Sequence, residues 1–147
     1  MAELSFRHPP LLESGVLAYR LDRRGTIRVL VVTTKSGRWG IPKGRVEPHL
    51  SFADNAAKEA FEEAGIRGEV APVAAGMYRA IKRTAAGEIV IEVWVYPMRV
   101  TEILEDFPER GRRAAKWVTV DEAARLLREP FLAKQCLELA ARTPSIA

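Results

Sequence analysis

Three glutamates, Glu59, Glu62 and Glu63, lie at spacings i, i+3 and i+4 in a segment that we expect to be helical from about Phe52 to Ala64. This spacing places their carboxylates on one helical face, where like charges repel each other. Hard divalent cations such as Mg2+ take oxygen ligands and complete their shell with water and substrate phosphates. The spacing therefore indicates a divalent-metal site. The alternative is a solvated acidic face on which Lys58 pairs with Glu62, four residues further on.

The same segment carries the signals of a helix start and a helix stop. Ser51 can cap the first turn, Asp54 follows it at the third helical position, and Gly65 can adopt the left-handed conformation that ends a helix. The opposite face from the glutamates is a stripe of small apolar residues, which comprises Ala53, Ala56, Ala57, Ala60 and Ala64. One side of this helix is therefore expected to pack, and the other to collect negative charge.

The stretch from Gly40 to Ile66 resembles the signature of the Nudix hydrolase family. Gly44 takes the position of the first signature glycine, and residues 58–66, K-E-A-F-E-E-A-G-I, are in register with its second half. Two positions depart from the pattern: Leu50 stands where the family has its first glutamate, and Lys58 replaces an arginine. The resemblance implies an α/β fold in which a mixed sheet is sandwiched between helices (α/β/α), with residues 1–147 forming a single Nudix domain.

The resemblance also implies roles for individual residues. Glu59, Glu62 and Glu63, together with Gly44, are expected to hold Mg2+ or Mn2+, and Glu59 and Glu62 are the catalytic candidates, with Glu62 as the base. Lys58 keeps a positive charge but lacks the two-pronged geometry of arginine. The Leu50 departure leaves a noncatalytic or weakly active nucleotide-binding domain as an alternative, although Glu47 lies close enough in sequence to compensate for it.

Two further stretches point to the substrate class. Residues 39–48, W-G-I-P-K-G-R-V-E-P, resemble dinucleoside polyphosphate hydrolases, whereas residues 100–117 are similar to the diphosphoinositol polyphosphate phosphohydrolases. Both groups imply a polyphosphorylated small molecule that is cleaved at a phosphoanhydride bond. Arg38, Lys43, Arg45 and Arg113 are the candidates for binding its phosphates, because cationic side chains make charge-assisted hydrogen bonds to phosphate.

Composition and charge narrow the class of protein. With 147 residues, of which 48% are hydrophobic, the chain can bury one core but hardly two. The net charge of +4 suits a polyanionic ligand, and no long Lys/Arg block indicates nucleic acid. No apolar run is long enough for a membrane span, and the N-terminal ten residues lack a signal core, so we expect a cytoplasmic protein, either monomer or homodimer. Cys136 is expected to be a core thiol.

The remaining elements are expected from hydrophobic alternation and turn residues. A hairpin is predicted from Ser14–Leu21 and Ile27–Thr34, and Glu88–Val100 is predicted to be a central strand covered on both sides. The other expected elements are an extended stretch over Val70–Ala80, a surface loop over Glu105–Arg113, a strand over Lys116–Val120, a helix capped by Asp121 and ending near Leu127, and a helix over Phe131–Ala141 with Leu132, Cys136, Leu137 and Ala140 along it.

Overall fold

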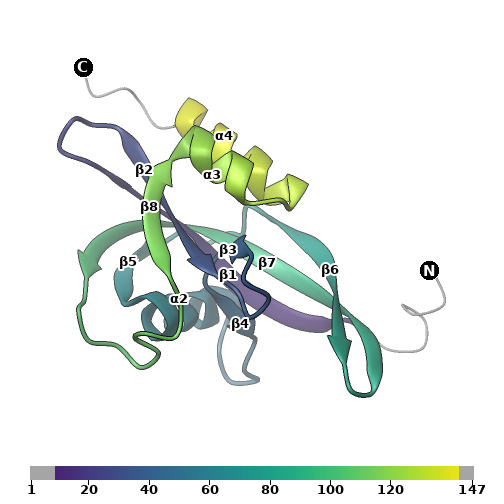
Figure 1. Ribbon diagram of the computed structural model, residues 1–147. Coiled ribbons are helices and arrows are strands. Elements are labelled where there is room, and N and C mark those ends of the chain that lie inside the picture. The colour runs from purple at the N-terminus through teal and green to yellow at the C-terminus, as the bar shows by residue number, and fades with distance from the viewer. Residues whose placement is uncertain (1–8, 143–147) are drawn as a thin grey trace.

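The computed structural model of the chain describes residues 9–142, which form one mixed sheet flanked by helices (Figure 1). Within these residues the sheet has eight strands, and the order β3-β2-β1-β7-β5 forms its main path, with β4 on β1, β6 on β7 and β8 on β2. The strands are β1 Leu11–Leu21, β2 Ile27–Thr33, β3 Trp39–Gly40, β4 Lys43–Arg45, β5 Ile66–Val70, β6 Gly76–Thr84, β7 Gly87–Ile103 and β8 Ala115–Thr119, and the helices are α2 Phe52–Ala64, α3 Val120–Leu126 and α4 Pro130–Arg142.

The centre of the sheet is a parallel pairing between β1 and β7. The register runs from Leu11 opposite Ile91 to Tyr19 opposite Arg99, whereas every other strand pair in the described residues is antiparallel. Both faces of β7 are apolar, which is the pattern of a strand covered on both sides. The prediction of a central strand here is confirmed, although β7 begins one residue before the predicted start and continues three residues beyond the predicted end.

Helices cover both faces of the sheet, so the predicted α/β/α layering is confirmed. One core cluster joins Ala56 and Ala60 of α2 to Val16, Leu30 and Met98 of the sheet. The other joins α3 and α4 to the opposite face, where Leu132, Cys136 and Leu139 pack on strand residues that include Leu17, Val31 and Val93. Figure 1 shows the same division, with α2 on one side of the sheet and the α3–α4 pair on the other.

The helix α2 has the bounds expected from its sequence. The Ser51 hydroxyl accepts a hydrogen bond from the backbone N–H of Asp54 at 3.0 Å, which caps the first turn. Gly65 ends the helix in the left-handed region, with φ of 66°, and its N–H is directed to the carbonyls of Ala60 and Phe61. The ring of Phe107 occupies the space that a Cβ at Gly65 would need. Position 65 is therefore fixed by both conformation and packing.

Three local predictions are wrong in detail, of which the first two concern β5–β6 and the start of α3. Val70–Ala80 is not one extended stretch, because β5 ends at Val70 and β6 begins only at Gly76; the intervening residues include Pro72, which cannot donate to a ladder. The cap of α3 is Thr119 rather than Asp121, since the Thr119 hydroxyl accepts from the N–H of Glu122 at 3.2 Å.

The third wrong prediction concerns α4, where Leu139 is buried in place of the expected Leu137. Leu137 is 51% exposed, whereas Leu139 is only 5% exposed and packs in the core together with Leu132 and Cys136. The predicted core thiol is confirmed. No helix within residues 9–142 combines the length and apolar character needed to cross a bilayer. The prediction about an N-terminal signal core rests on residues of which 1–8 lie outside the described part.

Cys136 should be inert toward thiol reagents in the native protein. Its side chain is fully buried, and burial raises the pKa of the thiol to about 11. Because the thiolate is the reactive form, we expect labelling by a disulfide reagent at pH 8 to be at least about a hundredfold slower in native buffer than in urea. The neighbouring exposed position gives the control: a Leu137→Cys variant should label one thiol rapidly without denaturant. Fast stoichiometric labelling of the unmodified native chain would contradict the burial.

Candidate active site

Two of the three signature glutamates lie against the backbone of β4. The N–H of Lys43 donates a hydrogen bond to Oε1 of Glu63 at 3.3 Å. At Gly44, a Cβ would overlap the carboxylate of Glu59, so the absence of a side chain there lets this carboxylate lie against the strand. The carbonyl of Gly44 accepts from the amide of Asn55 at 3.4 Å.

Burial makes the ionised forms of these two glutamates costly. Burial is the largest cause that raises the pKa of Glu63, to about 7, and it also raises the pKa of Glu59. Arg113 opposes the shift at Glu63, with 3.8 Å between its Nε and Oε1 of Glu63. Oε2 of Glu59 is buried and has no hydrogen-bond partner. An unpaired, buried carboxylate oxygen beside a second carboxylate fits the donor set of a hard cation.

Glu62 is engaged differently from the other two signature glutamates. Its Oε1 accepts from Nζ of Lys58 at 3.1 Å, so the pairing that was the alternative to a metal site is present. Within residues 9–142 no three His, Cys, Asp or Glu side chains converge closely enough to form a ready-made metal site. The structure therefore brings together Glu59 and Glu63 with Gly44, while Glu62 is held by a cation on its own helix.

Glu47 lies close to the position of the absent signature glutamate. Its Oε1 lies 3.2 Å from Nζ of Lys58, so Lys58 bridges Glu47 and Glu62. The residue at position 50, a leucine, donates its backbone N–H to the carbonyl of Glu47 at 3.1 Å, which closes a turn and brings Glu47 back toward α2. That Glu47 compensates for the absent glutamate stays a prediction.

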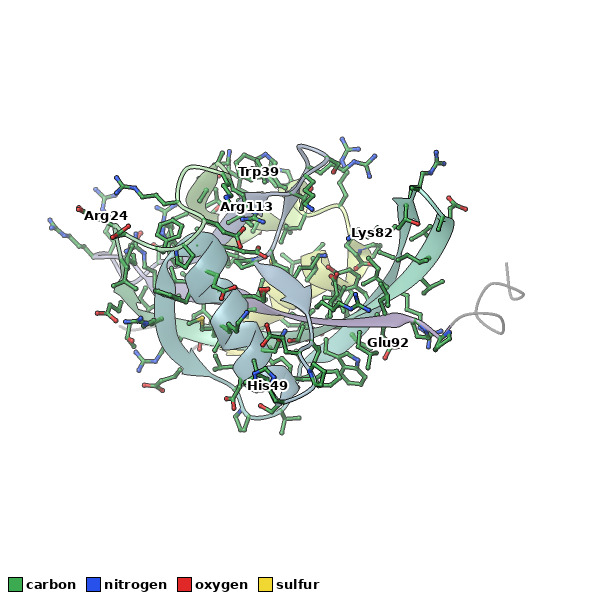
Figure 2. All side chains as sticks on the ribbon, turned by 90° about the horizontal axis from the view of Figure 1, so that it is seen from below. Arg24, Trp39, His49, Lys82, Glu92 and Arg113 are labelled. Carbon is green, nitrogen blue, oxygen red and sulfur yellow. The ribbon has the colours of Figure 1, made fainter. Side chains whose placement is uncertain are left out.

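The four predicted phosphate-binding residues are not all in one place. Arg113 contacts Glu109 at 2.6 Å and faces Glu63, so it lies beside the carboxylates. The backbone of Lys43 also contacts Glu63, but its Nζ is paired with Oε1 of Glu13 at 2.6 Å. Arg38 lines a hollow that begins at Lys43, and Arg45 is exposed at the end of β4. Figure 2, which views the side of α2, shows Arg113 and His49 at opposite ends of the helix.

Asn55 is a site residue that sequence reasoning missed. It is fully buried, and its amide donates to Oγ of Ser14 at 3.0 Å and to the carbonyl of Gly44 at 3.4 Å. Its Oδ1 accepts from the N–H of Glu47 at 3.2 Å. One side chain thus ties α2 to β1, to β4 and to the loop after β4. Asn55 lies on the helical face that carries Glu59 and Glu62 rather than in the alanine stripe, so the helical pattern gave no signal of its burial.

Glu109 is a second residue that sequence reasoning missed. Its loop was expected to lie on the surface, and two other acids of that loop, Glu105 and Asp106, are exposed. Glu109 instead donates its N–H to the carbonyl of Glu62 at 2.9 Å and holds Arg113. The charged loop therefore packs part of itself against the end of α2, and no spacing in the sequence marks which of its acids does so.

A hollow of about 530 Å³ lies between the β2–β3 segment, β6 and the α3–α4 connection. Lys43, Trp39 and Tyr78 line it from the sheet, and Arg125 and Arg128 line it from the helices. Its volume is within the usual range for small-molecule sites. Lys43 is one of the residues that line the hollow, and its backbone N–H contacts Glu63, so this residue lies between the hollow and the carboxylates.

Comparison with known proteins gives the class to which this fold and site belong. The family model of the NUDIX domain matches residues 11–139. The chain is 31% identical over 138 residues to Nudix hydrolase 12, mitochondrial, of Arabidopsis thaliana, an alignment that covers 82% of this chain and 68% of that protein. The chain therefore belongs to the Nudix hydrolase family, which generally uses divalent metal ions.

Two further comparisons concern particular relatives. The chain is 29% identical over 117 residues to bovine (Bos taurus) diphosphoinositol polyphosphate phosphohydrolase 3-beta, covering 78% of this chain and 67% of that protein. The crystal structure of C. elegans Ap4A hydrolase superposes with a TM-score of 0.62 at 16% identity, covering 90% of this chain and 97% of that one.

These comparisons confirm the predicted fold, the predicted family and its hydrolase character. They also confirm the predicted resemblance to the diphosphoinositol polyphosphate phosphohydrolases, whereas the likeness to Ap4A hydrolase concerns the fold. The chain spans between 61% and 68% of the length of the first four curated relatives that it matches. One relative is named as mitochondrial, so the cytoplasmic location stays a prediction.

Removing the Asn55 side chain should destabilise the protein through unpaired polar groups. In Asn55→Ala the hydroxyl of Ser14 and the N–H of Glu47 lose their partner, and each buried unpaired group costs about 1–3 kcal/mol. Urea denaturation should show this loss, whereas Asp54→Asn, an exposed change on the same turn, should stay within about 0.5 kcal/mol of the parent. Equal effects of the two substitutions would mean that Asn55 does not tie these elements together.

Proposed function

We propose that this protein hydrolyses a phosphoanhydride bond in a polyphosphorylated small molecule, with Mg2+ or Mn2+ as cofactor. The observation that carries the proposal is the pair of partly buried carboxylates, Glu59 and Glu63, of which Glu59 has a buried oxygen without a partner. Lys43, whose N–H contacts Glu63, also lines a hollow that carries arginines. Two carboxylates held apart from water are unfavourable alone and become favourable around a cation.

Different residues of the site would have different roles in this reaction. Glu59 and Glu63, with Gly44, would hold the divalent ion, which supplies charge neutralisation for the phosphate oxygens and acidifies water. Glu62 would take a proton from the attacking water, whose oxygen forms a new bond to phosphorus as the bridging P–O bond breaks. Lys58 holds Glu62 in place for that step. Arg113 lies where it can offset negative charge that stays on the phosphates.

The substrate class follows from the relatives and the charge of the site. A diphosphoinositol polyphosphate phosphohydrolase and an Ap4A hydrolase are among the proteins that the chain resembles, and both names refer to phosphate-rich small molecules. We place the natural substrate in this chemical class. We propose that the protein acts on it as a cytoplasmic monomer or homodimer, and we assign no role to nucleic acid or membrane. The net charge of +4 agrees with a polyanionic ligand.

A noncatalytic nucleotide-binding domain is the second candidate. It is favoured by Leu50 in place of the first signature glutamate and by the engagement of Glu62 with Lys58. The two candidates differ in a single measurement, which is Mg2+-dependent release of phosphate or nucleotide from a panel of polyphosphate substrates. Binding of these substrates without turnover would favour the second candidate.

Neutralising the signature glutamates should abolish most of the turnover. Glu62→Gln and Glu63→Gln remove a base and a metal ligand while keeping side-chain size, and we expect each to lower kcat at least about a hundredfold. Steady-state assays with Mg2+ and with a chelator measure this. The matched control is Glu105→Gln, which changes an exposed carboxylate on the loop between β7 and β8 and should leave kcat unchanged. Full turnover in both signature variants would remove α2 from the mechanism.

Glu47 should act as a positioning residue through Lys58. Glu47→Gln leaves Lys58 with a single carboxylate partner, and changes in such outer-shell partners typically cost about 10- to 100-fold in activity or metal affinity. We expect kcat to fall by about tenfold, the Mg2+ concentration for half activation to rise, and KM to change little.

The Glu47 experiment has both a control and a rescue. Glu88→Gln breaks a more exposed ion pair with Arg83 in the β6–β7 hairpin and should have no effect. Adding Leu50→Glu to the Glu47→Gln variant should restore part of the rate, because it returns a carboxylate to the signature position. If Glu47→Gln and Glu88→Gln behave alike, Glu47 has no positioning role.

A further inference from the structure

The hollow beside the carboxylates is lined by cations that come from two separate parts of the chain. Arg38 reaches it from the turn between β2 and β3, and Arg125 and Arg128 reach it from the last turn of α3 and the connection to α4. The two groups are far apart in sequence and meet only because α3 and α4 pack over the face of the sheet that carries β2 and β6. Figure 1 shows the α3–α4 pair above this face.

These three arginines lack the partners that the cations beside α2 have. Within residues 9–142, Arg38, Arg125 and Arg128 make no ion pair or side-chain hydrogen bond. By contrast, Lys58 is held by Glu47 and Glu62, and Arg113 by Glu109. The folded chain thus neutralises the cations near the signature helix and leaves those of the hollow unpaired.

The carboxylates near the hollow do not cancel its positive charge. Glu129 lines it, but its Oε2 accepts from the N–H groups of Phe131 and Leu132, at 2.6 and 3.4 Å, and so caps α4. Glu13 lies near Tyr78 and is paired with Nζ of Lys43. The hollow therefore keeps an excess of positive charge from three guanidinium groups, which suits phosphate groups because guanidinium binds phosphate oxygens in a bidentate manner.

The aromatic lining adds a further cation to this region. Nζ of Lys116 lies 4.8 Å from the centroid of the Trp39 ring, so one side of this ring carries an ammonium group. Tyr78 is buried and packs against Phe131. The hollow thus offers unpaired cations as its main binding groups, and one aromatic ring that is itself in contact with a cation.

We propose that Arg38, Arg125 and Arg128 form a subsite for phosphate groups beyond the diphosphate that is cleaved. This inference rests on the proposed function, since the scissile diphosphate is placed at Glu59 and Glu63. The remainder of a substrate anchored there would extend past Lys43 into the hollow. The subsite makes the protein selective for substrates with more than two phosphates over substrates in which a single diphosphate joins two uncharged groups.

The test compares two substrates that differ in phosphate number. The variant Arg125→Gln/Arg128→Gln should lower kcat/KM for diadenosine tetraphosphate at least about tenfold, because each arginine removed is a charge-assisted contact. For ADP-ribose, which has only the diphosphate, kcat/KM should change less than about threefold. The matched control is Arg23→Gln/Arg24→Gln in the β1–β2 turn, which removes the same charge from exposed positions; Figure 2 shows Arg24 at the far edge of the molecule from Lys82. This control should affect neither substrate.

A binding measurement without turnover separates the subsite from the proposed reaction. Inositol hexakisphosphate has no phosphoanhydride bond, so its affinity can be measured by calorimetry in chelator. Arg125→Gln/Arg128→Gln and, separately, Arg38→Gln should weaken its binding at least about tenfold and about fivefold, and the control variant should not. If no substrate is hydrolysed but this pattern of binding holds, the proposed reaction fails and the subsite stands. If the control variant loses as much affinity, or the arginine variants lose none, the subsite is overturned.

Equal losses on diadenosine tetraphosphate and ADP-ribose would also overturn the subsite. In that case the arginines would contact a part that both substrates share, and they would not distinguish substrates by phosphate number. Thermal unfolding of every variant accompanies the assays. The exposed arginines have no side-chain hydrogen bond or ion pair within residues 9–142 to lose, so the variants should unfold within a few degrees of the parent.

Discussion

The close approach of α2 to the backbone of β4 is the constraint on which the rest of the site depends. The carboxylate of Glu59 occupies the space that a Cβ at position 44 would need, and the neighbouring N–H of Lys43 meets Glu63. The strand itself is held by antiparallel pairing with β1, with Gly44 opposite Ser14. Asn55 of α2 makes hydrogen bonds to Ser14 of β1, to Gly44 of β4 and to Glu47 in the loop after β4. The carboxylates are therefore placed by a helix that is held against a strand rather than by a loop.

Charge is distributed unequally between two adjoining regions of the molecule. Beside α2, acids outnumber bases, and each base is already in an ion pair. In the hollow on the far side of Lys43, bases outnumber acids, and three of them are unpaired within the described residues. The proposed cation site and the proposed anion site thus meet at Lys43. A metal–polyphosphate complex has the same division of charge, which is why one ligand can satisfy both regions.

Much of this could be predicted from the sequence where the determinants are local. The bounds of α2 followed from Ser51, Gly65 and the alanine stripe, since caps and periodicity act within a few residues. The start of α3 was placed two residues late because Thr119 and Asp121 are both competent caps, and only the end of β8 decides between them. The split into β5 and β6 escaped notice because both strands pair with β7, which lies further along the chain.

The site could be predicted only in part, for the same reason. The spacing of Glu59 and Glu63 is a property of one helix. The ion pair between Lys58 and Glu62, by contrast, depends on side-chain rotamers and on the position of Glu47. Asn55 appeared to be an ordinary helix residue until β1 and β4 supplied its partners. Arg125 and Arg128 belong to no recognisable sequence motif. Only the fold shows that they line the same hollow as Arg38.

The parallel pairing of β1 with β7 has a consequence for how the chain acquires its structure. It joins residues near one end of the described chain to residues that are synthesised much later. Contacts so distant in sequence must meet the entropy of closing a long loop before they contribute, which slows folding. A ribosome-bound nascent chain can form the β1–β2 hairpin and α2 early, but it exposes the apolar faces of both until β7 emerges. Until β7 emerges, these apolar faces and the edge of β1 lack their partner strand, a condition that favours aggregation.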